Sequence, residues 1–204
     1  MEYYDISNIE GPAKILRDGE VLALPTETVY GLAVRADDRK AFDRLVSTKN
    51  RQPDKPFALA FDCLASALPL LEIDQRAKAV MEHFLPGQLT VLVRAKATLP
   101  WHVTLGTGVV GVRIPDDPYV SKVLRAVGVP CLLTSANLSG QPTSRTYEEA
   151  LHYFQDKIGG IVKGECVSKI PTTIVDLSKE NQISLVRQGA LPLDEIQAIW
   201  EEAK

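Results

Sequence analysis

Short apolar runs that alternate with amphipathic stretches constrain the fold of this 204-residue chain more than any other feature. Runs such as FALAF (57–61), LTVLV (89–93) and VPCLLT (129–134) have the length of buried strands. Between such runs, as in DRKAFDRLVSTKN (38–50), apolar residues recur at helical spacing. This alternation is the pattern of an α/β domain, in which helices pack on a sheet.

The same pattern predicts the individual elements. We expect helices at 11–19, 38–50, 74–84, 119–127, 147–154 and 193–203, and strands at 20–25, 28–36, 57–61, 89–93, 109–114, 129–134, 159–162, 172–177 and 183–186. No Ser/Gly-rich linker divides the chain, so one domain is expected over 1–204, with a motif-bearing core at about 11–190 and a C-terminal helix at about 193–203. The connections are too short and varied for a regular βαβ ladder, which predicts a mixed, largely open sheet.

Composition argues against several classes of function. The formal net charge of −3 gives no general attraction to nucleic acid or membranes, so RNA binding would need a local basic patch. Three cysteines and three histidines are scattered without metal-ligand spacing, which argues for reduced thiols and against a zinc site. The N-terminus has no secretory h-region, and no apolar run approaches the roughly 20 residues of a membrane span. We therefore expect a soluble, cytoplasmic protein without membrane contact.

Several common nucleotide and hydrolase motifs are missing or stand in the wrong context. Neither GxxxxGK[ST] nor GxSxG occurs, which argues against a P-loop and against an α/β-hydrolase. GTGVVG (106–111) matches GxGxxG, but it leads into the apolar run VRIP and not into a helix. A glycine-rich turn between two strands is the better interpretation.

Polar side chains gather where predicted strands and helices end. LPTETVYGL sets two threonines and a glutamate between apolar runs and uses β-branched residues that stiffen the chain, which indicates a shaped polar floor. In STKNRQPDKP, Lys49, Arg51 and Lys55 follow a predicted helix, in a loop that Pro53 and Pro56 stiffen. This basic cluster is either a solvated helix end that complements the helix dipole or a clamp for polyphosphate or carboxylate.

A second polar cluster follows the apolar run VPCLL. TSANLSG places Ser135, Asn137 and Ser139 after that strand, which is where ligands bind in α/β sheets. A turn or a helix cap built from Ser and Asn explains the segment equally well. IPTTIVDL and LVRQGAL add Thr172 and Arg187 beside two further strands, and each of these signals is weak alone.

Taken together, seven segments of this chain resemble the YrdC-like family, the L-threonylcarbamoyladenylate synthases: PTETVYGL, KNRQPDKP, PGQLTVLV, VGVRIPDDP, TSANLSG, PTTIVDL and LVRQGAL. They occur in the family's order from about residue 21 to 190, and PTETVYGL combined with TSANLSG is very specific. The chain looks like the short bacterial form, without the extra C-terminal domain of longer members.

The resemblance implies a twisted, largely open sheet around a concave, positively lined cavity. It also implies a nucleotidyltransferase that joins L-threonine, bicarbonate and ATP to give threonylcarbamoyl-AMP and pyrophosphate. This reaction is the first step of threonylcarbamoyladenosine formation at position 37 of tRNAs that read ANN codons. The implied partners are the three substrates, downstream threonylcarbamoyl-transfer proteins and a contact with tRNA or double-stranded RNA.

Roles for individual residues are implied as well. Threonine is expected near Thr28, which matches the family's threonine contact, together with Thr26, Tyr30, Arg113 and Thr172. ATP is expected on Lys49, Arg51, Lys55, Ser135, Asn137, Ser139 and Arg187. The expected catalytic group within that set is Lys49, Arg51, Ser135 and Asn137. Mg²⁺ is expected with ATP, although no protein ligand for a metal can be assigned, and catalysis is expected from positioning and electrostatics.

Two positions depart from the family's pattern. Ala60 stands where longer members carry a histidine, and Pro171 stands where many members carry an acid. Because some relatives of this fold have no demonstrated synthase activity, the alternative is a non-catalytic RNA-binding or ribosome-assembly relative. Sparse aromatic residues, at 6% of the chain, and the compactness of the basic cluster favour the enzyme.

Overall fold

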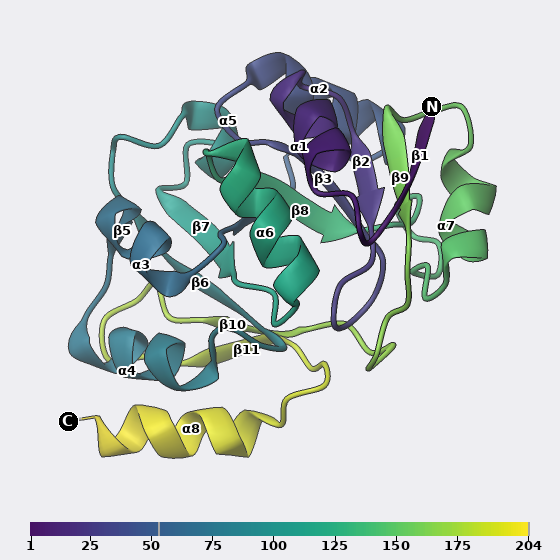
Figure 1. The fold of residues 1–204 in the computed structure, drawn as a ribbon. Coiled ribbons are helices and arrows are strands. Elements are labelled where there is room, and N and C mark those ends of the chain that lie inside the picture. Colours follow the sequence, from purple (N-terminus) through teal and green to yellow (C-terminus); the bar gives the residue numbers. More distant parts are fainter. Residues whose placement is uncertain (53, 204) are drawn as a thin grey trace.

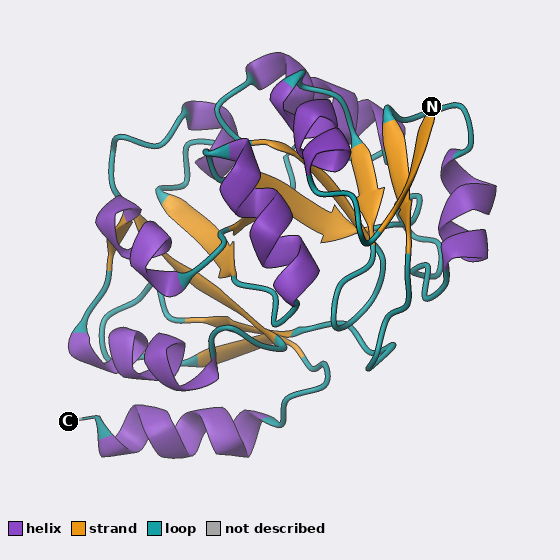
Figure 2. Ribbon diagram, viewed as in Figure 1, coloured by secondary structure: helices purple, strands orange, loops and turns teal. Residues whose placement is uncertain are grey.

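The uninterrupted apolar strands are explained by a sheet that is packed on both faces. The computed structural model describes residues 1–52 and 54–203; Pro53, which was expected to stiffen the basic loop, and Lys204 lie outside the described residues. The described residues form a single α/β domain built on one eleven-stranded sheet that mixes parallel and antiparallel pairs, as predicted (Figures 1 and 2).

The strands follow one another across the sheet in the order β1-β9-β2-β3-β8-β4-β7-β6-β10-β11, and β5 pairs with β6. Their bounds are β1 Glu2–Asp5, β2 Leu22–Leu24, β3 Gly31–Arg35, β4 Ala58–Ala60, β5 Leu71–Glu72, β6 Leu89–Ala95, β7 Val109–Arg113, β8 Cys131–Ser135, β9 Gly160–Lys163, β10 Thr173–Asp176 and β11 Ser184–Arg187. Sequence patterns predicted nine of these strands; the exposed edge strand β1 and the two-residue β5 were missed.

The helices are α1 Glu10–Arg17, α2 Arg39–Thr48, α3 Leu64–Ala67, α4 Gln75–Phe84, α5 Trp101–Thr104, α6 Pro118–Val127, α7 Tyr147–Phe154 and α8 Leu193–Glu202, with a 3₁₀ turn at Leu68–Leu70. Side-chain caps explain where several of them begin. The carboxylate of Asp74 accepts from the backbone N–H of Ala77, and Thr146 does the same for Glu149. The short α3 and α5 were not predicted. Among the described residues, no helix is long and apolar enough to cross a membrane.

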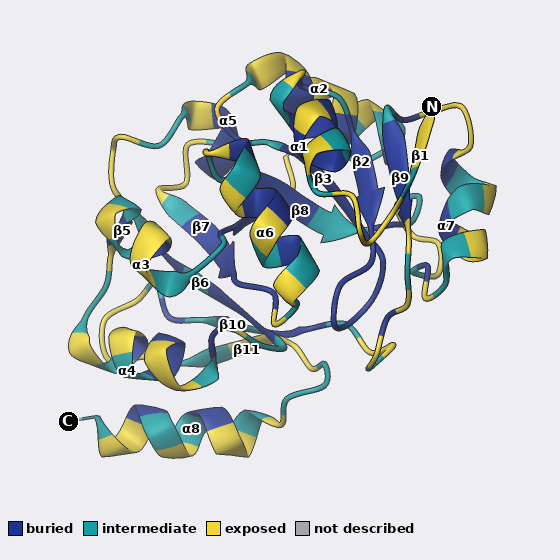
Figure 3. Cartoon of the chain, in the orientation of Figure 1, coloured by how far each residue is buried: buried dark blue, intermediate teal, exposed yellow. Residues whose placement is uncertain are grey.

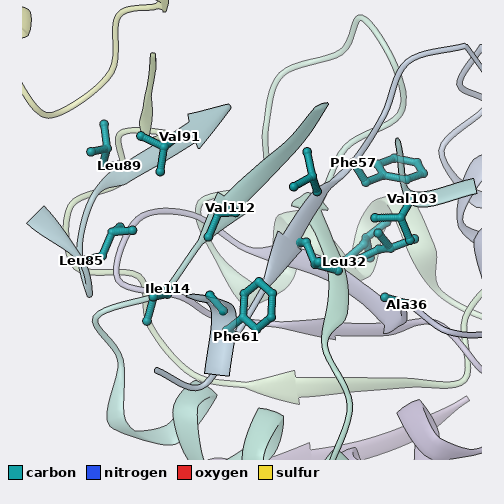
Figure 4. Packing of buried hydrophobic residues seen from close by; sticks show 14 of the residues in the cluster. Leu32, Ala36, Phe57, Phe61, Leu85, Leu89, Val91, Val103, Val112 and Ile114 are labelled. Carbon is teal, nitrogen blue, oxygen red and sulfur yellow. The ribbon is translucent and has the colours of Figure 1, made fainter. Parts of the chain in front are cut away.

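Alternate residues of the central strands pack into two different cores. In β3, Leu32 and Val34 belong to the larger core and Ala33 to the smaller one. The smaller core lies under α1 and α6, which run side by side over one face of the sheet (Figures 1 and 3). The larger core occupies the other face, and Figure 4 shows part of its packing around Phe57 and Val112.

The segment before β3 is not part of the strand, although we expected a strand over 28–36. The hydroxyl of Thr26 donates to the backbone oxygen of Val29 at 2.8 Å and accepts from the backbone N–H of Thr28 at 3.3 Å. These local hydrogen bonds hold a bend in place of sheet pairing, so β3 begins only at Gly31. The glycine-rich turn before β7 was predicted correctly, although α5 precedes it.

The same two-residue alternation creates one polar surface on the sheet. β4, β6, β7 and β10 direct Leu59, Val91, Val112 and Val175 into the larger core. The residues that alternate with them, Ala58, Thr90, Arg113 and Ile174, line a cavity. The periodicity that builds the core therefore also exposes a row of side chains to a candidate site.

Close contact between the chain around β10 and the chain after β11 shapes one wall of this cavity. A Cβ added at Gly189 would lie 2.3 Å from the backbone oxygen of Pro171 and 2.3 Å from the carbonyl carbon of Thr172. Neither is the movable end of a side chain, so only glycine fits there without a backbone shift.

We therefore expect Gly189→Ala to lower the free energy of unfolding by about 2 kcal/mol, because overpacking displaces backbone. Urea unfolding of the variant and of wild type measures this cost. Gly108→Ala is the matched control, since its added Cβ meets nothing within 4 Å and only its φ of +70° is strained. A Gly189 variant that unfolds at the same urea concentration as wild type would contradict the close approach.

Candidate functional site

The cavity on the polar face of the sheet has a volume of about 180 Å³ and is the candidate site. It lies among three guanidinium groups from distant parts of the chain. Its lining is Val29, Arg51, Pro56, Phe57, Ala58, Thr90, Arg113, Leu133, Thr134, Ser135, Pro171, Thr172, Ile174 and Arg187. Residues from the polar floor, the basic loop, TSANLSG, IPTTIVDL and LVRQGAL are thus brought together.

Arg113, at the end of β7, is held by the polar floor. Its Nη2 donates to Oγ1 of Thr28 at 2.6 Å and to Oγ1 of Thr26 at 2.9 Å. The same nitrogen lies 3.1 Å and 3.3 Å from the two carboxylate oxygens of Glu27, and both side chains of this ion pair are over 90% buried. Thr26 and Thr28 are themselves fully buried. The floor therefore surrounds one nitrogen of a single guanidinium.

Lys49 directly follows α2, and only 1% of its surface is exposed. Its Nζ donates to the backbone oxygens of Ser135 (2.5 Å) and Asn137 (2.8 Å) and to Oδ1 of Asn137 (3.2 Å). The backbone oxygen of Lys49 accepts from the N–H of Ser139 at 2.9 Å. Burial, and after it the charge of Arg51, lower the pKa of Lys49 to about 7. Lys49 thus joins the end of α2 to the segment after β8.

The TSANLSG segment is cross-linked internally as well. Oγ of Ser135 donates to Oδ1 of Asn137 at 2.7 Å, and Nδ2 of Asn137 donates to the backbone oxygens of Leu138 and Gln141. The amide of Asn137 therefore fixes the turn. Ser135 lines the cavity, whereas Ser139 is exposed and contributes its backbone N–H to Lys49.

The basic cluster is divided by the structure. Arg51 lines the cavity, donates to the backbone oxygens of Lys55 and Pro56 at 3.1 Å each, and stacks 5.0 Å from the ring centroid of Phe57. Burial lowers the pKa of Arg51. Lys55 is exposed and does not line the cavity. The three cations predicted as one clamp are therefore separated. Lys49 is buried, Arg51 lines the cavity and Lys55 lies on the surface.

Arg187 and Thr172 meet at the opposite wall. Nε and Nη2 of Arg187 donate to the backbone oxygen of Thr172 at 3.2 Å and 2.8 Å, and Nη2 lies 3.2 Å from its hydroxyl. Burial and the nearby charge of Arg113 lower the pKa of Arg187. The hydroxyls of Thr172 and Thr90 are 2.9 Å apart. A protonated Arg113 and a protonated Arg187 therefore repel each other across one cavity.

Tyr30, expected beside the threonine site, lies elsewhere. Its ring is fully buried, and its hydroxyl donates to the backbone oxygens of Val162 (3.0 Å) and Gly164 (2.8 Å) at the end of β9. It is not part of the cavity lining. Burial raises its pKa well above the ordinary range. Its contacts connect the polar floor to β9.

Sequence reasoning assigned no role to Glu27 or Thr90, which the structure places in or beside the site. Glu27 is a buried carboxylate paired with Arg113, and Thr90 lines the cavity against Thr172. In the sequence, a role for Glu27 was indicated only by its position between two threonines just before a strand. Thr90 stands within an apolar strand, where it is the single hydroxyl in LTVLV, and that alone does not indicate a site.

Comparisons with known proteins relate this chain to one family. The family model Sua5_yciO_yrdC, described as "Telomere recombination", matches residues 14–189. The threonylcarbamoyl-AMP synthase of Bacillus subtilis (strain 168) is 33% identical over 190 residues, which cover 92% of this chain and 55% of that protein. The threonylcarbamoyl-AMP synthase of Vibrio vulnificus (strain YJ016) is 33% identical over 188 residues, which cover 90% of this chain and all 100% of that protein.

A solved structure has the same fold. The crystal structure of Pyrococcus abyssi Sua5 complexed with L-threonine superimposes with a TM-score of 0.90 at 31% identity, over 97% of this chain and 60% of that one. The chain therefore spans little more than half the length of the Bacillus and Pyrococcus proteins.

We expect Lys49→Met to lower the free energy of unfolding by about 2 kcal/mol, because three partly buried oxygens each lose a donor while the side-chain volume is kept. Urea unfolding measures the loss. Lys40→Met, at an exposed position of α2, is the matched control and is expected to change stability by less than about 0.5 kcal/mol. Equal effects of the two substitutions would show that Lys49 does not hold the loop.

The pKa of Lys49 also predicts how stability depends on pH. Between about pH 7 and its ordinary value of 10.5, the unfolded chain keeps a proton that folded Lys49 has released. Unfolding then takes up a proton, so this group makes the free energy of unfolding rise with pH in that window. The stability difference between wild type and Lys49→Met is therefore expected to be larger at pH 9 than at pH 6. A difference that shrinks would contradict the lowered pKa.

Proposed function

Since the chain belongs to the Sua5/YciO/YrdC family, we propose that it is a threonylcarbamoyl-AMP synthase. The enzyme joins L-threonine, bicarbonate and ATP by nucleotidyl transfer, with pyrophosphate as the other product. In this proposal the enzyme acts in the cytoplasm and catalyses the first step of threonylcarbamoyladenosine formation in tRNA. Transfer proteins downstream take up the product, and tRNA is a candidate contact.

One observation carries the proposal: Arg51, Arg113 and Arg187 line the same small cavity. The burial and mutual repulsion that lower the pKa of Arg187 leave this cavity with a positive potential that an anion would relieve. All three substrates of the proposed reaction carry anionic groups, so they repel one another in water. Fixed guanidinium groups that screen this repulsion supply the main catalytic requirement.

The proposed chemistry has two steps. The neutral amine of threonine attacks the carbon of bicarbonate, a C–N bond forms, and a C–O bond breaks with release of water. An oxygen of the resulting carbamate then attacks the α-phosphorus of ATP, and the bond to the β-phosphate bridging oxygen breaks to release pyrophosphate. Threonine, bicarbonate and ATP thus give threonylcarbamoyl-AMP, pyrophosphate and one water. Both steps are favoured by holding the reactants together.

The geometry suggests how the residues divide this work. Arg113, Thr172 and Thr90 form the side of the cavity that we assign to threonine, the amino acid with which the Pyrococcus relative was solved. Arg51 and Arg187 are assigned to the phosphates, because a guanidinium fork pairs with phosphate oxygens in two places. Ser135 supplies a hydroxyl between the two sides, and Lys55 and Ser139 remain candidates at the mouth.

Lys49, Asn137, Thr26, Thr28 and Tyr30 support the site in a different way. The polar side-chain atoms of these residues are hydrogen-bonded to other protein groups. We therefore propose that these residues hold the cavity walls in place. The amide of Asn137 fixes the TSANLSG turn, and Lys49 binds that turn to α2. Preorganised walls avoid a cost of rearrangement when charge develops.

Mg²⁺ is assigned to the substrate and not to the protein. The described residues contain no group of three or more His, Cys, Asp or Glu side chains that could hold a metal ion. The cavity lining offers guanidinium and hydroxyl groups, which are poor donors for Mg²⁺ compared with carboxylates. We therefore propose that the metal enters with ATP, bound to its phosphates.

The proposal is tested by pyrophosphate release from ATP, with threonine and bicarbonate each omitted in turn. Release is expected only when both are present. Arg187→Ala is expected to lower kcat/KM about 100-fold, because it removes a fixed cation from the site. Arg125→Ala is the control, because that arginine pairs with Asp62 away from the cavity and its side chain is 70% exposed.

The opposite outcome has a definite meaning. Folded protein that binds ATP but releases no pyrophosphate with all three substrates would overturn the synthase. The non-catalytic RNA-binding relative would then be the better account, and RNA-binding measurements on Arg51→Ala would follow.

A further inference from the structure

We propose that Glu27 is a positioning residue, which orients Arg113 so that the rest of its guanidinium is available to the carboxylate of the amino-acid substrate. The inference rests on the proposed function, because it assigns that carboxylate to Arg113. Glu27 is not part of the cavity lining, so it acts through Arg113 and not by touching substrate. The three residues Thr26, Glu27 and Thr28 are called the bracket below.

The bracket contacts a single nitrogen of Arg113. Four oxygens lie within hydrogen-bond distance of Nη2, from 2.6 Å to 3.3 Å, and all come from the bracket. An amino group of a guanidinium has only two hydrogens to donate, so this nitrogen is more than satisfied. A new acceptor would gain nothing from it.

The remaining nitrogens of Arg113 have no such partners. Nε is buried and has no hydrogen-bond partner among the described residues. The side-chain hydrogen bonds of Arg113 within those residues all start from Nη2. A buried donor without an acceptor costs free energy, on the order of 1–3 kcal/mol. A carboxylate that enters the cavity can supply the missing acceptor in a charge-assisted hydrogen bond, and this recovers that cost.

The bracket is buried against the segment that contains Cys166 and Ser168, so the charge of Glu27 acts in surroundings of low polarity. The backbone N–H of Ser168 donates to the backbone oxygen of Glu27 at 2.9 Å, and the neighbouring Cys166 is 97% buried. Water is thus kept from a carboxylate whose side chain is 9% exposed. Low polarity strengthens the ion pair, and removal of the carboxylate would leave Arg113 beside Arg187 with no compensating charge.

Two features separate this arrangement from a purely structural ion pair. The carboxylate holds the side of Arg113 that faces the floor, and the uncommitted nitrogens belong to a group that lines the cavity. Loss of the pair should therefore disturb the amino-acid substrate while leaving the phosphate side, formed by Arg51 and Arg187, in place. A structural pair would instead change stability without distinguishing between substrates.

The test compares Glu27→Gln and Glu27→Asp with wild type in steady-state pyrophosphate release. Glu27→Gln keeps the shape but loses the charge, and it is expected to raise the KM for L-threonine about tenfold while the KM for ATP stays within twofold. Glu27→Asp restores the charge at a shorter reach and is expected to recover part of the loss. L-Threonine binding by calorimetry, with no ATP present, should weaken by the same factor.

Asp62→Asn is the matched control, because Asp62 forms a partly buried pair with Arg125 away from the cavity. It is expected to lower the melting temperature without changing either KM. A Glu27→Gln enzyme with wild-type KM for threonine, or with equal increases for threonine and ATP, would overturn the inference. If wild type itself neither binds threonine nor releases pyrophosphate, the proposed function fails and the role of Glu27 fails with it.

Discussion

The desolvation of cations around one cavity is the constraint on which the rest of this structure depends. Removing a cation from water is costly, and Lys49, Arg113 and Arg187 are each paired with oxygens that come from another segment of the chain. Lys49 donates to oxygens at the end of β8 and in the turn after it, Arg113 to oxygens in the bend before β3, and Arg187 to the residue before β10. These contacts between cations and oxygens join segments that are far apart in sequence. The interactions that offset the cost of burying these cations therefore also hold the walls of the site in place.

The cations around the cavity differ in how many hydrogen bonds they make to protein oxygens. Nζ of Lys49 donates to three protein oxygens, and Nη2 of Arg113 lies within hydrogen-bond distance of four. Among the described residues, Arg51 is held only by its own loop and by Phe57, and Lys55 is exposed. The number of protein contacts thus falls from the buried Lys49 and Arg113 to the exposed Lys55. Groups whose polar atoms are all bonded to protein can only preserve shape, whereas loosely held groups can respond to a ligand, which suits the anion-binding role proposed for this site.

Much of the fold could be predicted because hydrophobic periodicity is a local signal. α7 begins and ends at the predicted residues, and the other long helices differ by one or two residues at an end. β1 and β5 could not be predicted, since an exposed edge strand and a two-residue strand carry no apolar run. The cavity drew together the segments that the motifs indicated, but the partner of each side chain could not be known in advance. Hydroxyl pairing between Thr90 and Thr172, 82 positions apart, depends on the order of strands in the sheet. The direction in which the Tyr30 side chain points depends on β9, whose Val162 lies 132 positions further along the chain.

The two departures from the family's pattern have different structural meanings. Ala60 is fully buried in the core under α1 and α6 and does not line the cavity, so in this chain its small side chain serves packing. Pro171 does line the cavity, where an acid in its place would set a carboxylate among three arginines. The proline leaves their positive charge undiminished, and its backbone oxygen still accepts from the N–H of Ala190 at 3.1 Å. Because that contact and the close approach of Gly189 use backbone atoms, the wall keeps its shape without the acid. The substitution therefore changes the charge of the cavity more than its geometry, in the direction that favours anionic substrates.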